Sequence, residues 1–176
     1  MTETELVERC KRGDRTGQRL LYDKYIVPMT RLCYRYIGDS EATKDILADA
    51  FMNIFDRIHQ FQYRGEGSLT AWIHRIVVNQ ALMWLRSNKS LVLRLEDQDV
   101  VVSTPETPIS SLQAEDLYNL ICQLPTGYRT VFNLYAIEGY SHEEIATRLG
   151  ITESASRSQL TRARQYLLAL LNKPNT

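Results

Sequence analysis

The sequence has few of the features that mark secreted, membrane or metal-binding proteins. Its three cysteines, Cys10, Cys33 and Cys122, are widely spaced and odd in number, so neither a disulfide framework nor a metal cluster is expected. No run approaches the roughly 18 apolar residues of a membrane span, and the polar N-terminus lacks the apolar core of a secretion signal. We therefore expect a cytoplasmic protein with buried free thiols.

The chain also lacks an excess of charge of either sign. Its 21 basic residues balance 21 acidic ones, so no global positive field draws it to nucleic acid. Any nucleic-acid function must therefore be local. Catalytic motifs are missing as well: there is no glycine-rich phosphate loop, no metal-ligand spacing and no carboxylate pair beyond ordinary helix faces. We expect no enzymatic activity, no cofactor and no metal.

Helix-breaking residues are scarce in the first half, where apolar residues recur at helical spacing. One helix is predicted over residues 16–37, with Gly38-Asp39-Ser40 ending it and capping a second helix over 41–61. The inward side chains of the helix over 16–37 are predicted to be Leu20, Leu21, Tyr25, Leu32, Cys33 and Tyr36. The turn sequence QYRGEGS then precedes a third helix over 69–86, which Ser68 or Thr70 can cap.

The second and third predicted helices differ in charge. The second carries the acidic residues Glu41, Asp45, Asp49 and Asp56. Residues 71–94 contain no acid, but they include Arg75, Arg86, Lys89 and Arg94. This contrast indicates a local basic face next to an acidic one.

The pattern changes between residues 91 and 114. Pro105 and Pro108 break helices there, and acidic residues far outnumber a single Arg94. We interpret this segment as a flexible acidic linker between two small helical domains, residues 1–90 and 115–176. The fold class predicted is all-α, with no strand-rich segment.

The stretch HEEIATRLGITESASRSQLTRAR is typical of a helix-turn-helix. Ser141 and Glu144 form the capping box S-x-x-E, which predicts a helix start, and Gly150 predicts its end. Ala146, four residues before Gly150, allows two helices to cross closely. Thr152 or Glu153 then opens a second helix.

The second helix of this pair is predicted to expose a polar, basic face. Its inward positions are Ala155, Leu160, Ala163 and Leu167. Its outward positions are Ser154, Arg157, Ser158, Thr161, Arg162 and Gln165. Arginines with short polar side chains suit entry into a major groove. An ordinary helical hairpin with a solvated face is the alternative.

Taken together, these residues resemble the extracytoplasmic-function (ECF) group of bacterial sigma factors, which belong to the sigma-70 family. DILADAFMNIFDRI is similar to region 2.2, FQYRGEGSLTAWIHRIVVNQALMWLR to regions 2.3 and 2.4, and LPTGYRTVFNLYAIEGYSHEEIATRLGITESASRSQLTRAR to region 4. The resemblance implies a promoter-specificity subunit of RNA polymerase. Core polymerase then supplies catalysis and most nonspecific contacts with DNA, which agrees with a neutral chain.

The resemblance also implies roles for residues in the first half. The docking helix for the coiled coil of the largest polymerase subunit would carry Asp45, Ile46, Asp49, Phe51, Met52 and Phe55, although Ile46 and Phe55 can equally be core residues. The minus-10 element would be bound and melted by Tyr63, Arg64, Arg75 and Asn79. Trp72 matches a family tryptophan, but we interpret it as a core residue because Ile76 and Met83 share its face.

For the second half, the resemblance implies reading of the minus-35 element. The residues at the matching positions are Ser154, Arg157, Ser158, Thr161 and Arg162. Ser156 stands where many family members have valine, so we expect either a hydroxyl bond to a helix carbonyl or a slightly rotated helix. The implied partners are core polymerase, including its flap, promoter DNA and an anti-sigma protein, with no direct membrane insertion.

Three alternatives stay open on the sequence alone. A freestanding helix-turn-helix regulator would bind duplex DNA tightly without polymerase, but it gives the basic helix over 69–86 no purpose. A helical enzyme or ligand-binding protein has no candidate residues. A sigma-like protein that has lost promoter activity can be excluded only by an activity test.

Overall fold

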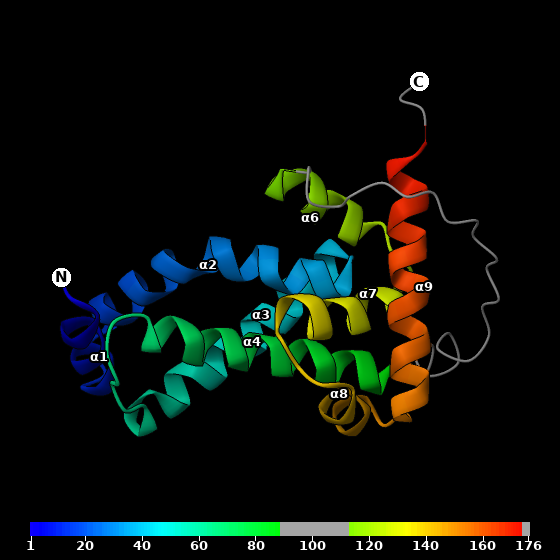
Figure 1. Ribbon diagram of the computed structural model, residues 1–176. Helices are drawn as coiled ribbons and strands as arrows, with labels where there is room; N and C mark the ends of the chain where they lie inside the picture. The colour runs from blue at the N-terminus through cyan, green and yellow to red at the C-terminus, as the bar shows by residue number, and fades with distance from the viewer. Residues whose placement is uncertain (89–112, 174–176) are drawn as a thin grey trace. The chain divides into compact units, whose positions relative to one another are not determined.

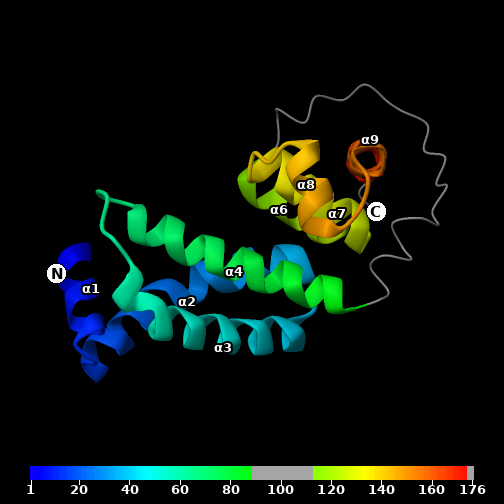
Figure 2. The same cartoon turned by 90° about the horizontal axis from the view of Figure 1, so that it is seen from below.

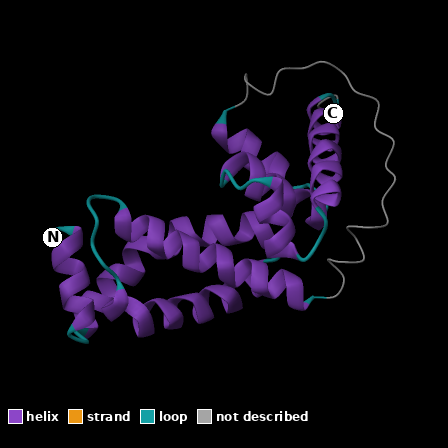
Figure 3. Cartoon of the chain, turned by 60° about the horizontal axis from the view of Figure 1, so that its bottom comes forward, coloured by secondary structure: helices purple, strands orange, loops and turns teal. Residues whose placement is uncertain are grey.

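The computed structural model describes residues 1–88 and 113–173, and within these ranges every regular element is a helix (Figure 3). The predicted all-α class is confirmed. The predicted linker lies almost entirely outside the described residues, as do Lys89 and Arg94. No helix among those described is long and apolar enough to cross a membrane.

The chain divides into two units, Met1–Trp84 and Leu85–Thr176 (Figure 1). The division falls inside one helix, α4. Each unit is built from helices that pack on one another, and each carries a separate part of the candidate interface. The predicted domain limits at residues 90 and 115 stay a prediction.

The first unit contains the helices α1 (Glu3–Lys11), α2 (Arg15–Ile37), α3 (Ser40–Arg57) and η1 (Ile58–Gln60), and most of α4 (Ser68–Ser87). α2 and α3 are joined by a tight turn in which Gly38 ends α2 in the left-handed conformation and Asp39 caps α3 through the backbone N–H of Ala42. This is the predicted turn, and it makes α2 and α3 neighbours (Figure 2).

The core of the first unit agrees with the predicted inward stripe of α2 except at one position. Leu21, Tyr25, Leu32, Cys33 and Tyr36 are buried. The prediction for Leu20 is wrong, because this side chain is 40% exposed. Leu20 directly precedes buried Leu21 on the helix, and one step of about 100° turns it away from the core.

The start of α4 also differs from the prediction. Ser68 is the first residue of the helix, and its hydroxyl accepts a hydrogen bond from the backbone N–H of Arg64 at 3.2 Å. The hydroxyl of Thr70 shares a hydrogen bond with that of Tyr25 on α2 at 2.9 Å. Both hydroxyls therefore hold the loop and the helix start in place instead of supplying the predicted cap.

The second unit contains α6 (Ala114–Cys122), α7 (Thr126–Phe132), the π-helical turn η3 (Asn133–Ile137), α8 (His142–Leu149) and α9 (Glu153–Leu171). α9 packs against α6, α7 and α8. Arg129, only 6% exposed, joins α6 to α7 by donating from Nη1 to the carbonyls of Cys122 and Leu124 at 3.1 and 3.3 Å. This buried arginine satisfies carbonyls at the end of α6.

The three cysteines are free thiols. Cys10 and Cys33 are buried as expected, whereas Cys122 is half-buried. Burial raises the pKa of the Cys33 thiol to about 12, so this thiol stays protonated and unreactive at neutral pH. Cys10 and Cys33 are therefore core residues.

Candidate nucleic-acid interface

A cavity of about 390 Å³ lies where the loop after η1 meets the first turns of α4. Its lining combines aromatic, amide and guanidinium groups from Gln60, Phe61, Gln62, Arg64, Ser68, Ala71, Trp72 and Arg75. The rings of Phe61 and Trp72 contact each other with centroids 5.3 Å apart. A base can stack on such rings while amide and guanidinium groups bind its edge.

The cavity brings together only part of the predicted minus-10 set. Arg64 and Arg75 line it and are exposed. Tyr63 is 45% exposed but lies outside the lining, as does exposed Asn79, which follows Arg75 by one helical turn on α4. Asn79 therefore lies one turn from the cavity on the same helix, and the minus-10 roles of Tyr63 and Asn79 stay a prediction.

The interpretation of Trp72 as a core residue holds only in part: Ile76 on the same face is buried, and the Trp72 ring packs on buried Phe61. The Trp72 side chain is half-buried and forms one wall of the cavity, and Met83, expected to share its buried face, is 64% exposed. The preceding loop supplies the other side of the cavity, and its Phe61 packs against the Trp72 ring. The periodicity of α4 alone gives no signal for this arrangement.

Two glycines set the path of this loop. Gly65 and Gly67 have φ values of 114° and 83°, which side-chain-bearing residues rarely adopt. A hydrogen bond from the backbone N–H of Arg64 to the hydroxyl of Ser68 spans both glycines and closes the turn. The glycines in QYRGEGS are therefore required by the path of the chain.

The helix-turn-helix has the predicted caps. Ser141 and Glu144 form the full capping box at the start of α8, and Gly150 ends α8 with a φ of 68°. Thr152 caps α9 through the backbone N–H of Ala155 at 3.0 Å. These contacts confirm a helix pair whose second member is α9.

The predicted outer face of α9 is exposed only in part, because its last member, Gln165, is half-buried. Ser154, Arg157, Ser158 and Thr161 are exposed, and Arg162 is half-buried as well. Arg157 pairs with Glu153 one turn earlier, with Nη2 and Oε2 at 3.1 Å. The guanidinium is thus held along the N-terminal half of the helix, where base contacts are made in helix-turn-helix proteins.

Ser156 does not bond to a carbonyl of its own helix, so the first of the two expectations is wrong, and the second, a slightly rotated helix, stays a prediction. Ser156 is fully buried, and its Oγ forms a hydrogen bond with Nδ1 of His142 on α8 at 2.8 Å. The His142 ring stacks on Tyr135 of η3, with centroids 4.5 Å apart and planes 17° apart. Sequence reasoning missed this contact, because the partner lies on another helix.

The predicted docking residues on α3 fall into two groups. Asp45, Asp49 and Met52 are exposed and Phe55 is half-buried, so these four can contact a partner. Ile46 and Phe51 are 4% and 3% exposed, so both belong to the core and any role in docking is indirect. Tyr22 of α2, not predicted, is 41% exposed and adds an aromatic edge to this face.

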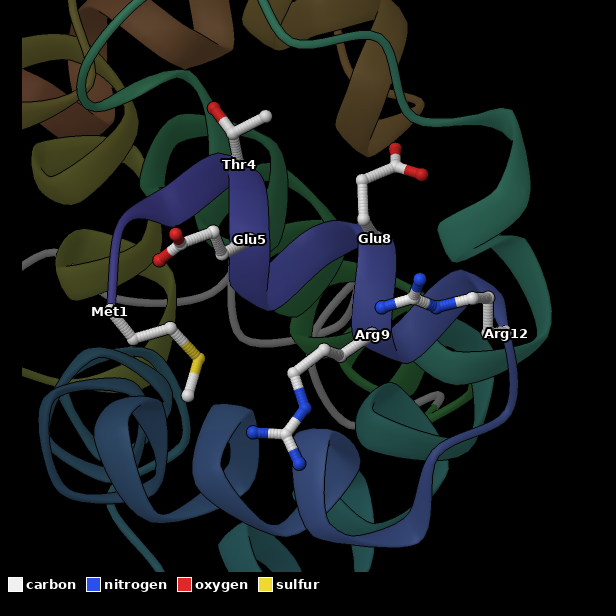
Figure 4. A pocket seen from close by; sticks show the side chains of 6 residues that line it. All are labelled: Met1, Thr4, Glu5, Glu8, Arg9 and Arg12. Atoms are coloured by element: carbon white, nitrogen blue, oxygen red, sulfur yellow. The ribbon is translucent and has the colours of Figure 1, made fainter.

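Another cavity, of about 470 Å³, lies along α1 and is lined by Met1, Thr4, Glu5, Glu8, Arg9 and Arg12 (Figure 4). Its side chains leave one helix in different directions and do not converge. Glu5 belongs to the capping box of α1, Glu8 pairs with Lys11, and Arg9 pairs with Asp14. These groups support α1, and the cavity offers no candidate chemistry.

Two family models match the chain. Residues 21–91 match sigma-70 region 2, and residues 114–167 match sigma-70 region 4. The first covers the candidate docking face and the cavity, and the second covers the helix-turn-helix. Together they span most of the described residues in both units.

Characterised relatives cover nearly the whole chain. The ECF RNA polymerase sigma-E factor of Haemophilus influenzae is 29% identical, covering 95% of this chain and 94% of the relative. The sigma-H factor of Pseudomonas aeruginosa is 29% identical, covering 94% and 91%. The ECF sigma-E factor of Escherichia coli K12 is 28% identical, covering 95% and 93%.

A solved structure shares the fold. It is that of CnrH in complex with the cytosolic domain of CnrY, which is 23% identical, with a TM-score of 0.50 and 97% of each chain covered. The helical fold, the matches to both sigma-70 regions and the relatives matched over more than 90% of their length thus agree on one family. The chain belongs to the sigma-70 family and is an ECF sigma factor, a promoter-specificity subunit of RNA polymerase.

Proposed function

We propose that the two units divide promoter recognition between them. The second unit reads the minus-35 element with the outer face of α9, through Ser154, Arg157, Ser158, Thr161 and Arg162. The first unit takes the minus-10 element, with one unstacked base entering the cavity beside Trp72 and with Arg64 and Arg75 binding the strand. The observation that carries this proposal is the cavity at the start of the basic helix α4, which is lined by aromatic and guanidinium groups.

Core polymerase is the proposed partner of α3. Its exposed acidic and apolar side chains, Asp45, Asp49 and Met52, suit a surface that offers both cations and apolar area. A neutral chain with two small basic faces binds free DNA weakly, because phosphate contacts dominate such affinity. The complex with core polymerase is then the form that binds promoters.

We further propose that the protein acts in the cytoplasm and has no enzymatic activity of its own. An anti-sigma protein is the proposed regulator, and it would cover the polymerase-binding face. This assignment follows from membership of the ECF group, whose members are commonly held silent in this way.

The test is run-off transcription from a pool of genomic promoter fragments, using purified core polymerase with and without the protein. New discrete transcripts whose upstream regions share two spaced elements support the proposal. Association with core polymerase without transcripts points to a regulator that occupies the sigma site. Tight binding to duplex DNA without association with core polymerase supports the alternative, a freestanding helix-turn-helix regulator.

A further inference from the structure

His142 of α8 and Ser156 of α9 are joined by a hydrogen bond where the two helices pack on each other. Ser156 is fully buried, so its hydroxyl has no water to bond with and depends on a protein partner. Nδ1 of His142 provides that partner at 2.8 Å. Because the bond is directional, it fixes the rotation of α9 about its axis more narrowly than two apolar side chains can.

Further contacts hold the imidazole itself. Its ring stacks on Tyr135 of η3, and the Arg164 guanidinium lies 5.9 Å from the centroid of the same tyrosine ring. His142 is also the first residue of α8, directly after the capping box at Ser141. The ring therefore has contacts with η3 and α9 while its backbone is fixed by the start of α8.

The position of Ser156 gives this contact a consequence for DNA reading. It is followed directly by Arg157 and Ser158, both exposed on the outer face of α9. Side chains at the edge of a helix lie roughly 5–6 Å from its axis, so a rotation of about 20° moves them by ~2 Å. A shift of this size breaks a hydrogen bond to a base edge.

We infer that His142 and Ser156 form a clamp that sets the rotation of α9 on α8 and so positions Arg157 and Ser158 for the minus-35 bases. This inference rests on the proposed minus-35 role of α9. The two residues are positioning residues, because Ser156 is buried and the His142 ring contacts Ser156 and Tyr135. Their effect is on which base is preferred.

Three substitutions separate the hydrogen bond from the ring stack. Ser156→Ala removes the hydroxyl and leaves a side chain small enough for the buried space. His142→Phe keeps a ring to stack on Tyr135 but cannot bond with Ser156, whereas His142→Asn places an amide atom near the Nδ1 position and loses the stack. Thr147→Ala is the matched control, since Thr147 is exposed on α8 and its hydroxyl bonds only to its own helix, at Glu143.

The experiment uses the full-length protein with core polymerase on promoter libraries randomised separately at the minus-35 and minus-10 elements. We expect Ser156→Ala and His142→Phe to lower use of the preferred minus-35 sequence about two- to tenfold, as for the loss of one hydrogen bond. Both should broaden the minus-35 base preference and leave the minus-10 preference unchanged. His142→Asn and Thr147→Ala should stay closer to wild type.

Two results overturn the clamp: an unchanged minus-35 profile in both variants, or an equal loss on every minus-35 sequence accompanied by a lower melting temperature. The second result reduces the contact to a purely structural one. A wild-type protein without any minus-35 preference instead overturns the proposed role of α9, and this outcome is visible before any variant is compared.

Discussion

The ring of Tyr22 on α2 packs edge-on against the ring of Phe51 on α3, with centroids 4.8 Å apart and planes at 60°. Phe51 is buried, whereas Tyr22 is 41% exposed. The pair therefore connects the core of the first unit to its surface. Tyr22 thus adds an exposed aromatic side chain of α2 to the candidate docking residues of α3.

Replacing Tyr22 tests this extended docking face. We expect Tyr22→Ala to raise the dissociation constant for core polymerase about tenfold, because buried aromatic residues dominate protein interfaces. Tyr22→Phe keeps the ring and should bind nearly as wild type. Val27→Ala is the control, since Val27 is also exposed on α2, at 66%. Equal affinities for the Tyr22→Ala and Val27→Ala proteins would confine docking to α3.

Trp72 is expected to matter for strand opening more than for docking. Trp72→Ala removes a stacking surface from the cavity, and each base stacked on an aromatic ring is worth about 1–3 kcal/mol. Permanganate reactivity of minus-10 thymines should fall, while binding to core polymerase is retained. Met83→Ala changes an exposed apolar residue of the same helix and should have no effect. Unchanged reactivity in Trp72→Ala would reject the base-binding role of the cavity.

Arg157 is expected to read one base of the minus-35 element. Arg157→Ala should cost about 1–3 kcal/mol in discrimination at one position, as for a lost bidentate contact with guanine. Transcription from promoters with each base at each minus-35 position measures this loss. Ser154→Ala, at another exposed position of α9, is the comparison. If Arg157→Ala weakens all promoters equally, the arginine contacts phosphate instead.

Local chemistry made much of this fold predictable. The capping box of Ser141 and Glu144, the left-handed Gly150 and the Gly38-Asp39 turn each depend on residues within four positions of one another. Such contacts form at helix ends between residues that are close in the chain, so they can be predicted from a single sequence. The exposed positions Ser154, Arg157, Ser158 and Thr161 of α9 follow from helical periodicity, but the burial of Ser156 does not.

The contacts that were missed join residues far apart in the chain. Ser156 bonds with His142 on a neighbouring helix, and Trp72 becomes a cavity wall because the preceding loop brings Phe61 against it. Neither residue has a local signal for its role. Phe51 is buried and its neighbour Met52 is exposed, and this difference likewise depends on where α2 packs against α3.

Gly17 lies where α1 and α2 cross, and replacing it tests how much the close packing of these helices contributes to stability. A Cβ at this position would lie 2.7 Å from Cβ of Arg9, because α1 crosses α2 closely there. We expect Gly17→Ala to destabilise the protein by about 1–2 kcal/mol, since overpacking outweighs the gain in helix propensity. Urea unfolding measures this change, with Thr16→Ala at the exposed neighbouring position as the control. A more stable Gly17→Ala protein would mean that α1 can move away without loss.

His142 predicts a pH dependence for the second unit. Burial, followed by the positive charge of Arg157, holds the pKa of His142 below its ordinary value of 6.5; Arg164 acts in the same direction and Glu153 against it. The unfolded chain therefore takes up the proton at a higher pH than the folded protein does. The resulting contribution to stability is complete above pH 6.5 and is lost as the pH falls below it.

The measurement is the free energy of unfolding at pH 7.5, 6.5 and 5.5, for wild type and His142→Asn. Other carboxylates and histidines titrate in both proteins, so the difference between the two curves isolates His142. We expect wild type to lose more stability than His142→Asn as the pH falls. Parallel curves would mean that the folded protein binds this proton as readily as the unfolded chain, and the imidazole would then not be held neutral by burial and by Arg157.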